Sequence, residues 1–565
     1  MKKSKFDLSH TLLSTGDFGY LYPILCEDIL PGDTFKCSSE VFVKAIPLLA
    51  PVLAQADVRV DYFFVPNRIL WEEWSDFITG GKEGTFDQKE PWFLYGSSSV
   101  QANINSEQRR FCSALYQLPI SADGEPSGAV RLSILPALAY ERIYRDWYMD
   151  QNVESDVWYY SDNVDRPFKY GFLPKNTQGD SFYDINGDFF NGTNVGYDFI
   201  SKHLHFRQRH YRKDMFTSAL PWPQRGPEVG FTIPNDDKNY DVYGETVDEG
   251  DYYRTDGSVA AGTPTFQNGK LLVGSNSAPA QHSHNVDSSV QILEGDLANI
   301  SIRELRRLSA LQKWFERNAR WGSRYIEQIL SHFGVHTPDY RLQRAEYLGG
   351  TISPINISET YQTADSSSEQ ETENVLGQYA GHMSSYGVNG MRKYTAQEHG
   401  WFLGLLSIVP KPSYSQGVQR RFTRQTRLDY AWPEFASIGE QAIARKELYF
   451  AGLNENSSAG FNTLNGAFGY TTRYAEYKSR QDRFDNNFRI NFPFWHLGRI
   501  FDSMPVLSRD FLEARNSSSG SQYDRIFAYT PNEGQYEQIF HFLFQIRHHL
   551  KMRRPLPKYV NPSLS

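Results

Sequence analysis

Few residues in the sequence have the types and spacing that suit catalysis or metal binding. Three pairs of histidines could in principle ligate a metal ion: His203 with His205, His282 with His284, and His548 with His549. No cysteine or carboxylate completes a ligand set at the spacing typical of zinc sites. We therefore interpret these histidines as solvated or hydrogen-bonded, and we predict neither a metal site nor a cofactor.

Enzyme motifs are also missing from the sequence. It contains no phosphate-binding P-loop, no serine nucleophile elbow, no HExxH zinc motif and no dinucleotide-binding glycine motif after a strand. Glu72 and Glu73 could serve acid/base catalysis, but neighbouring residues on a helix point to different faces. We predict that the chain is not an enzyme.

Positive charge is concentrated near the two ends of the chain. The candidate nucleic-acid contacts are Lys2, Lys3, Lys5, Arg547, Lys551, Arg553, Arg554 and Lys558. Such side chains could bind DNA phosphates, or they could simply be solvated surface residues, and the sequence leaves both readings open. We expect residues 547–565 to form a basic C-terminal tail.

The overall composition excludes several classes of protein. The net charge is −8 and the isoelectric point is near 6.0, which argues against a protein dedicated to coating nucleic acid. The three cysteines, Cys26, Cys37 and Cys112, are too few for a disulfide framework in 565 residues and favour a reducing compartment. No secretion signal is expected, because Phe6–His10 is polar where a signal peptide is apolar.

Hydrophobic periodicity predicts strands at the start of the chain and helices in its middle. Val58, Val60, Tyr62 and Phe64 alternate with polar residues, as in a half-buried strand. Residues 301–334 carry a capping box and an apolar helical face, and predict a helix. The apolar run Trp401–Val409 is too short to span a membrane, so no membrane insertion is predicted.

Two long polar stretches interrupt these elements. Residues 150–200 are rich in Tyr, Asp, Asn and Gly, and residues 228–297 contain eight acids against two bases between Asn235 and Gly257. Loops of this length are usually functional or disordered. The pattern favours a mainly β protein, a β-sandwich with expanded loops, over alternating β-α units.

A series of short motifs extends along nearly the whole chain. The most specific lie within residues 311–350, including the ten residues from Arg341 to Gly350. The others cover 30–35, 61–68, 71–74, 77–81, 214–226, 398–400, 414–417, 429–433, 439–441, 473–478 and 495–497. In this order they resemble the major capsid proteins of the Microviridae, specifically the gokushovirus branch of small single-stranded DNA bacteriophages.

The resemblance implies a fold and an assembly. The whole chain, 1–565, would form one discontinuous domain, an eight-stranded antiparallel jelly roll with large loop insertions and a few helices. Sixty copies would form an icosahedral T=1 shell around a circular single-stranded DNA genome. The large exposed insertion 228–297 would project at the three-fold axes. The protein would be made and assembled in the cytoplasm of the bacterial host and become part of the virion.

The resemblance also implies partners. These are other copies of the chain, the genome, small DNA-binding and pilot proteins of the phage, and a receptor on the bacterial surface. Because the insertion 228–297 is long and polar, it is the candidate for host attachment. Its candidate contact residues are Asp236, Asp237, Tyr240, Tyr243, Tyr252 and Tyr253.

Two rival classes remain to be weighed. A carbohydrate-binding or carbohydrate-active protein could also use a β-sandwich with aromatic loops, but an enzyme of that class needs two carboxylates placed in a cleft. A tail or scaffold protein would show heptads or repeats, and the sequence has neither.

Overall fold

The computed structural model describes most of the chain. The described residues are 3–71, 74–82, 90, 92–95, 106–118, 130–154, 204–226, 252–253, 259–260, 264–267, 270–273, 302–321, 325–336, 338–361, 379–450, 455–514, 522–528 and 540–558. They belong to two compact units, one formed by 1–225 with 316–565 and the other by 226–315. No helix within the described ranges is long and apolar enough to cross a membrane.

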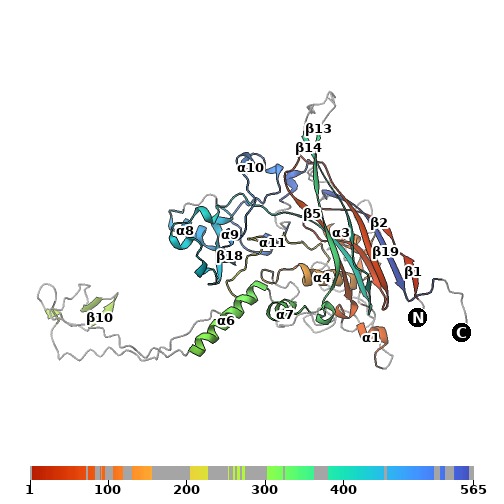
Figure 1. Cartoon of the computed structure of the whole chain (residues 1–565), viewed down its shortest axis with the longest axis horizontal. Helices are drawn as coiled ribbons and strands as arrows, with labels where there is room; N and C mark the ends of the chain where they lie inside the picture. The colour runs from red at the N-terminus through yellow and green to blue at the C-terminus, as the bar shows by residue number, and fades with distance from the viewer. Residues whose placement is uncertain are drawn as a thin grey trace. The chain divides into compact units, whose positions relative to one another are not determined.

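The first of two large antiparallel sheets, sheet A, brings together the first and last strands of the chain. Its strands are β1 (Ser4–Asp7), β2 (His10–Gly16), β4 (Thr34–Ala45), β13 (Asn356–Tyr361), β14 (Tyr379–Gly390), β15 (Tyr394–Thr395) and β19 (Phe542–Arg554). β19 pairs with β1 and β2 along one edge and with β4 along the other, and β4 also pairs with β14. In Figure 1 the red and blue ends of the chain therefore run side by side.

Strand β19 corrects the prediction of a basic C-terminal tail over residues 547–565. Residues 547–554 lie inside the sheet, because the strand continues to Arg554. Alternate residues from Phe542 to Met552 are buried, whereas Arg547, Lys551 and Arg553 are exposed between them. The many basic residues of this segment suggested a solvated tail, although its apolar residues alternate with polar ones as in a β-strand.

The second large sheet, sheet B, contains four antiparallel strands. In spatial order they are β12 (Glu346–Pro354), β5 (Ala56–Pro66), β16 (Gly400–Pro410) and β3 (Tyr22–Ile29). The alternation predicted for β5 is confirmed, because Val58, Val60, Tyr62 and Phe64 are all buried. The apolar run that was too short for a membrane helix forms β16, which is buried along almost its whole length.

The inner faces of the two sheets pack together into one core. Phe35 of sheet A lies 4.8 Å from Phe402 of sheet B, measured between ring centroids. The Tyr62 hydroxyl of sheet B donates a hydrogen bond of 2.6 Å to Ser39 Oγ of sheet A. The mainly β architecture, a sandwich with a few helices, is therefore as the sequence predicted.

Other parts of the chain cover the centre of the outer face of sheet B, whereas Ile352 of β12 on the same face is 55% exposed. Phe63 is buried against the rings of Trp147 and Tyr347, at centroid distances of 5.8 and 5.5 Å. Beside it Arg209 lies 2.8 Å from the Asp61 carboxylate. Helix α4 (Leu135–Ile143), with Pro136 in its first turn, packs on the same sheet.

The remaining elements are helices and small two-stranded sheets, and α6 with 20 residues is the longest of these helices within the described residues. The helices are α1 (Trp74–Thr79), α3 (Ser106–Tyr116), α6 (Ile302–Trp321), α7 (Tyr325–Phe333), α8 (Ser458–Asn465), α9 (Ala475–Lys478), α10 (Asn487–Ile490), α11 (Arg509–Leu512) and the π-helix η2 (Tyr144–Tyr148). Short 3-10 helices are η1 (Asn67–Ile69), η3 (Asp339–Leu342), η4 (Arg420–Phe422), η5 (Arg427–Asp429), η6 (Pro433–Phe435), η7 (Arg445–Glu447), η8 (Pro493–Trp495) and η9 (Asp524–Ile526). Small two-stranded sheets pair β6 (Trp92–Tyr95) with β7 (Val130–Ser133), and β17 (Glu440–Ala444) with β18 (Ala467–Thr472). The predicted helix 301–334 corresponds to α6 and α7, and residues 322–324 between them are outside the described residues.

A second, smaller core organises the segment between β16 and β19, residues 411–541. Its buried apolar residues are Phe216, Ala219, Tyr414, Ile443, Leu448, Phe468, Phe511 and Leu512. The buried Arg499 guanidinium lies 4.1 Å from the centre of the Phe511 ring and 4.5 Å from that of Tyr211. Such contacts with aromatic faces stabilise a buried cation.

Candidate nucleic-acid and assembly surfaces

The outer face of sheet A carries four exposed cations at one end, which we call the basic rows: Lys5, Lys36, Lys551 and Arg553. Lys5 stands opposite Arg553, and Lys551 stands opposite Lys36 on its other side. Side chains directly opposite on antiparallel strands have Cβ atoms about 5 Å apart. This arrangement concentrates positive charge where a polyanion can reach it.

One carboxylate lies within the basic rows. Asp7 stands opposite Lys551 on the other side from Lys36. Hydrogen bonds from the Ser9 hydroxyl and backbone N–H lower the pKa of the Asp7 carboxyl, and the charge of Lys551 adds to this effect. Asp7 therefore offsets one of the four positive charges.

The other candidate DNA contacts have different surroundings. Lys3 donates to the Gly32 carbonyl, and Arg554 lies 3.1 Å from the buried Asp33 carboxylate, so both hold the sandwich together. Arg547 is exposed on the outer face of sheet A, 3.5 Å from Glu40. Lys558 lies beyond the end of β19, and Lys2 is outside the described residues.

Lys36 is not among the DNA contacts predicted from the sequence. The signal was the alternation in residues 34–45, where Phe35, Cys37 and Val41 are buried while Lys36 and Lys44 are exposed. What a single strand could not reveal is that β19, more than 500 residues later, would place its own cations beside Lys36.

The opposite end of the same face carries exposed apolar side chains, which we call the apolar belt: Leu13, Phe42, Tyr386, Val388 and Leu543. Phe42 is 40% exposed and stands directly opposite Tyr386, which is 64% exposed. Exposed apolar residues clustered in this way mark interaction surfaces. Together with the basic rows, the belt makes this face of sheet A chemically suited to a partner.

A second set of exposed apolar residues lies on the segment 411–541. Phe422 is 72% exposed and Ile490 is 79% exposed. Others on this segment are Leu428, Tyr430, Trp432, Phe435, Ile438, Phe450, Phe461, Tyr477, Phe492 and Val506. So many large apolar side chains facing water indicate contact with other protein surfaces.

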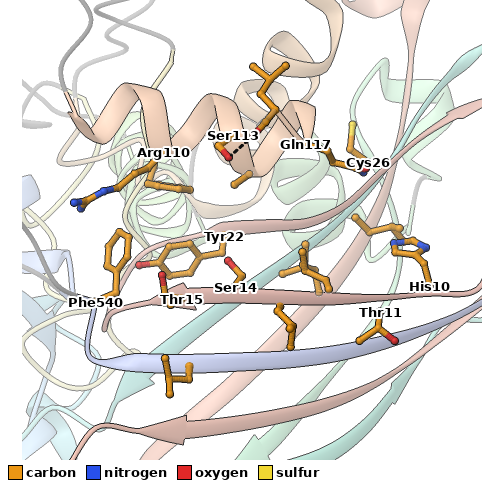
Figure 2. A pocket seen from close by; sticks show the side chains of 18 of the residues that line it. His10, Thr11, Ser14, Thr15, Tyr22, Cys26, Arg110, Ser113, Gln117 and Phe540 are labelled. Carbon is orange, nitrogen blue, oxygen red and sulfur yellow. Dashed lines mark hydrogen bonds between the residues drawn. The ribbon is translucent and has the colours of Figure 1, made fainter. Parts of the chain in front are cut away.

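A cavity of about 730 Å³ lies between α3 and strands β2 and β3 (Figure 2). Its lining includes Tyr22, Phe206 and Phe540, with the Arg110 guanidinium 5.0 Å from the centre of the Phe540 ring. Burial raises the pKa of the Cys26 thiol, which keeps it protonated and unreactive. The described lining contains no Asp or Glu, so it offers no pair of carboxylates for glycoside chemistry.

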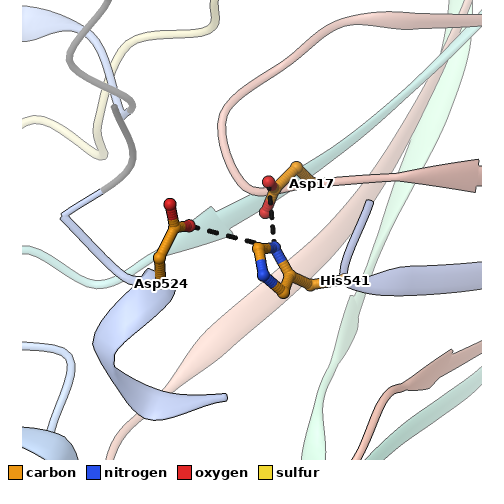
Figure 3. Close-up of side chains that lie close together, drawn as sticks. All are labelled: Asp17, Asp524 and His541. Carbon is orange, nitrogen blue, oxygen red and sulfur yellow. Dashed lines mark hydrogen bonds and ion pairs between the residues drawn. The ribbon is translucent and has the colours of Figure 1, made fainter. Parts of the chain in front are cut away.

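The ionisable side chains of Asp17, Asp524 and His541 lie close together, although Asp17 is more than 500 residues from the other two in the sequence (Figure 3). His541 Nδ1 lies 3.1 Å from Asp17 Oδ2 and 3.9 Å from Asp524 Oδ1. The imidazole also stacks on the Phe527 ring at 4.0 Å. Such a donor set could hold a divalent cation, but the hydrogen bond to Asp17 already accounts for the geometry as a tether between β2 and β19.

The histidine pairs do not assemble into metal sites within the described residues. His548 is fully buried, with Nδ1 2.7 Å from Ser39 Oγ and Nε2 3.0 Å from the Ile24 carbonyl oxygen. The neighbouring His549 lies on the other face of β19, 3.1 Å from Glu40. This agrees with the interpretation of hydrogen-bonded histidines. His203, His282 and His284 lie outside the described residues.

Four of the candidate host-contact residues, Asp236, Asp237, Tyr240 and Tyr243, lie outside the described residues. Tyr252 and Tyr253 form β8 (Tyr252–Tyr253), which pairs with β9 (Val259–Ala260). A second hairpin pairs β10 (Pro264–Gln267) with β11 (Lys270–Val273). These hairpins are the described part of the insertion 228–297; of the polar stretch 150–200, only 150–154 is described.

Comparison with known proteins gives a consistent result. The family model described as "Capsid protein (F protein)" matches residues 1–564. The chain is 29% identical to "Capsid protein VP1" of Chlamydia phage 1, over 100% of this chain and 96% of that protein. It is 28% identical to "Capsid protein VP1" of Bdellovibrio phage phiMH2K, with 91% and 88% covered, and 26% identical to that of Spiroplasma virus 4, with 100% and 95% covered. The resemblance derived from the short motifs is confirmed by these matches.

Proposed function

Since this chain belongs to the capsid protein (F protein) family, and is thus a structural component of a phage virion, we propose that sixty copies close an icosahedral shell around a circular single-stranded DNA genome. The observation that carries this proposal is the exposed apolar surface of residues 411–541, including Phe422 and Ile490. In a closed shell, heterologous contacts cycle around symmetry axes and bury such surfaces. The proposal includes no catalytic step.

We propose that the sandwich is an eight-stranded jelly roll. The support is the strand order, β2-β19-β4-β14 in sheet A and β3-β16-β5-β12 in sheet B. Along the chain, the strands alternate between the two sheets except for the pair β5 and β12, as in a double Greek key. The long insertions then fall between β5 and β12, and between β16 and β19.

We propose that the basic rows contact the phosphates of the genome. Of the predicted contacts, Lys5, Arg547, Lys551 and Arg553 are exposed on the outer face of sheet A, and Lys36 joins Lys5, Lys551 and Arg553 in the basic rows. Replacing counterions along a nucleic acid needs such a local surplus of cations, even in a chain whose net charge is −8.

We propose that the insertion 228–297 forms the three-fold protrusion and takes part in host attachment. Its eight acids between Asn235 and Gly257 would be costly to bury, which favours an exposed position. Deleting the insertion should leave particles that no longer bind host cells. Particles that bind cells normally after the deletion would contradict the attachment role.

The proposed partners are those that such a shell needs. They are other copies of the chain, the genome, small DNA-binding and pilot proteins of the phage, and a receptor on the bacterial surface, with assembly in the host cytoplasm. Co-purification of the phage proteins with particles made in bacteria tests this set.

The test of shell formation is electron microscopy, with a sizing column, of the chain expressed alone and together with the neighbouring phage genes. We expect uniform spherical particles in at least one preparation. Ile490→Asp and Phe422→Asp should prevent particle formation while preserving the circular dichroism spectrum, because both side chains are exposed in the single subunit. Ser458→Asp, which adds the same charge at an exposed polar residue, serves as the matched control. A stable monomer in both preparations would contradict the proposal.

A further inference from the structure

The apolar belt on the outer face of sheet A, formed by Leu13, Phe42, Tyr386, Val388 and Leu543, has no role in the sandwich core. We propose that it is a stacking platform for the unpaired bases of single-stranded DNA, with Tyr386 and Phe42 as the stacking rings. This inference rests on the proposed contact between the same face and the genome, and it adds the chemical group that the belt recognises.

The register of the strands places the two rings side by side. Tyr386 of β14 and Phe42 of β4 are directly opposite residues, so their Cβ atoms lie about 5 Å apart. Leu13 of β2 lies in the same row, across Gln545 of β19. The row therefore extends over four strands and ends in an aromatic pair that projects from a rigid sheet.

Cations flank this row on both sides. Lys44 lies two residues after Phe42 on β4, and Arg547 lies two residues after Gln545 on β19, opposite Glu40. Residues two apart on one strand face are separated by about 7 Å. A base stacked on either ring would thus have a cation near its own phosphate, which is the arrangement of single-strand binding surfaces.

The basic rows extend the same track. Lys36 lies six residues before Phe42 on β4, which corresponds to about 20 Å along the strand. A single strand of several nucleotides can span this distance. Its phosphates would reach the basic rows while two of its bases occupy the belt.

The balance of charge favours DNA over a protein partner. Within the described strands, the outer face of sheet A carries six exposed Lys or Arg residues, which are Lys5, Lys36, Lys44, Arg547, Lys551 and Arg553. The same face carries the acids Asp7 and Glu40, and Glu40 already contacts Arg547 and His549. In a duplex the faces of the bases are covered by stacking on neighbouring base pairs, so exposed rings favour a single strand.

The test uses the full chain in its unassembled form and two fluorescent probes at one salt concentration. One probe is a short oligothymidylate, and the other is an abasic oligonucleotide of the same length and charge. We expect the base-bearing probe to bind about tenfold more tightly for each stacked base. Tyr386→Ala should remove most of this preference and leave binding of the abasic probe unchanged.

Matched variants separate the outcomes. Tyr386→Phe, which keeps the ring, should retain the preference, and Phe422→Ala, an exposed aromatic residue elsewhere, should also retain it. Equal binding of both probes, with Lys551→Glu still weakening both, would overturn the stacking platform and leave the phosphate contact standing. Insensitivity of both probes to Lys551→Glu would instead overturn the proposed DNA contact itself. Loss of particles in Tyr386→Ala with unchanged binding of both probes would mark the belt as a contact between copies and overturn this inference.

Discussion

The two outer faces of the sandwich differ in what covers them. On sheet B, Phe63 is buried under Trp147 and beside Tyr347, its neighbour on β12, and Asp61 is paired with Arg209. On sheet A, Phe42 and the basic rows are exposed in the subunit. The centre of one face is therefore covered by its own chain, although Ile352 at the β12 edge is 55% exposed, while the other face presents charge and apolar surface to a partner.

Charged side chains near the two faces also differ in their surroundings, because those near sheet B are buried and paired while those on sheet A are exposed. Glu141 of helix α4, which packs on sheet B, is buried together with Arg207, and the two pair at 2.9 Å. Burial raises the pKa of the Glu141 carboxyl to about 7 in spite of Arg207, because removal from water outweighs the attraction. A buried ion pair of this kind carries a desolvation penalty and serves a contact within the chain. Cations that bind a partner instead remain exposed to solvent in the free subunit.

The largest effect is expected from truncating the covered face. Phe63→Ala should lower the free energy of unfolding by about 3–5 kcal/mol, because it leaves a cavity among the aromatic rings. Phe42→Ala, the matched change on the open face, should cost less than about 1 kcal/mol. Chemical denaturation of the unassembled chain measures both. Equal losses would mean that the two faces are equally covered.

The next largest effect is a loss of folding stability at acidic pH that arises from His548. Burial lowers the pKa of His548 to about 4, with the nearby His10 contributing. In the unfolded chain the imidazole takes up a proton near its ordinary pKa, so this group's contribution is fully present above about pH 6.5. It is lost as the pH falls toward 4, by about 3 kcal/mol in total.

A pair of variants isolates this effect. His548→Gln should flatten the fall in stability between pH 6.5 and 4 relative to its own value at neutral pH. His549→Gln, one residue along and on the other face of β19, should leave most of that fall in place, because the charge of His549 is the smallest of the four causes that shift the pKa of His548. Denaturation midpoints across this pH range provide the measurement, and equal slopes in both variants would refute the role of His548.

The smallest effect on stability is expected from the basic rows. Lys551→Glu combined with Arg553→Glu should change the free energy of unfolding by less than about 0.5 kcal/mol, because both residues are exposed. The same variant should reduce the slope of log affinity for single-stranded DNA against log salt by about 1.4, for two lost phosphate contacts. Arg341→Glu, an exposed cation of η3, is the control. A salt slope that stays unchanged in the double variant would exclude these two contacts.

The fold was predictable from sequence where one strand carried its own signal. Residues 57–64 alternate clearly, and the structure forms β5 there. Strand β19 was mistaken for part of a tail, because its burial depends on β4 and β2 more than 490 residues away. When the outward-facing residues of an alternating segment are Arg, His and Lys, the sequence does not distinguish a strand from a solvated tail until its partner strands are known.

The candidate surfaces were predictable only in part. Basic residues at both ends of the chain were identified from charge alone, but Lys3 and Arg554 turned out to hold the sandwich together. Lys36 and Tyr386 carried no signal of a binding role, since each is an ordinary residue until the register of the sheet places it. The cluster of Asp17, Asp524 and His541 also could not be predicted, because Asp17 is more than 500 residues from the other two in the sequence.

The most direct test is ultraviolet cross-linking in particles whose DNA contains bromodeoxyuridine, followed by mass spectrometry of the linked peptides. We expect cross-links on the open face, at Tyr386 and Phe42 and in the peptides of β1, β4 and β19. Cross-links confined to residues 411–541 or to the covering residues of sheet B, with none on the outer face of sheet A, would contradict this expectation.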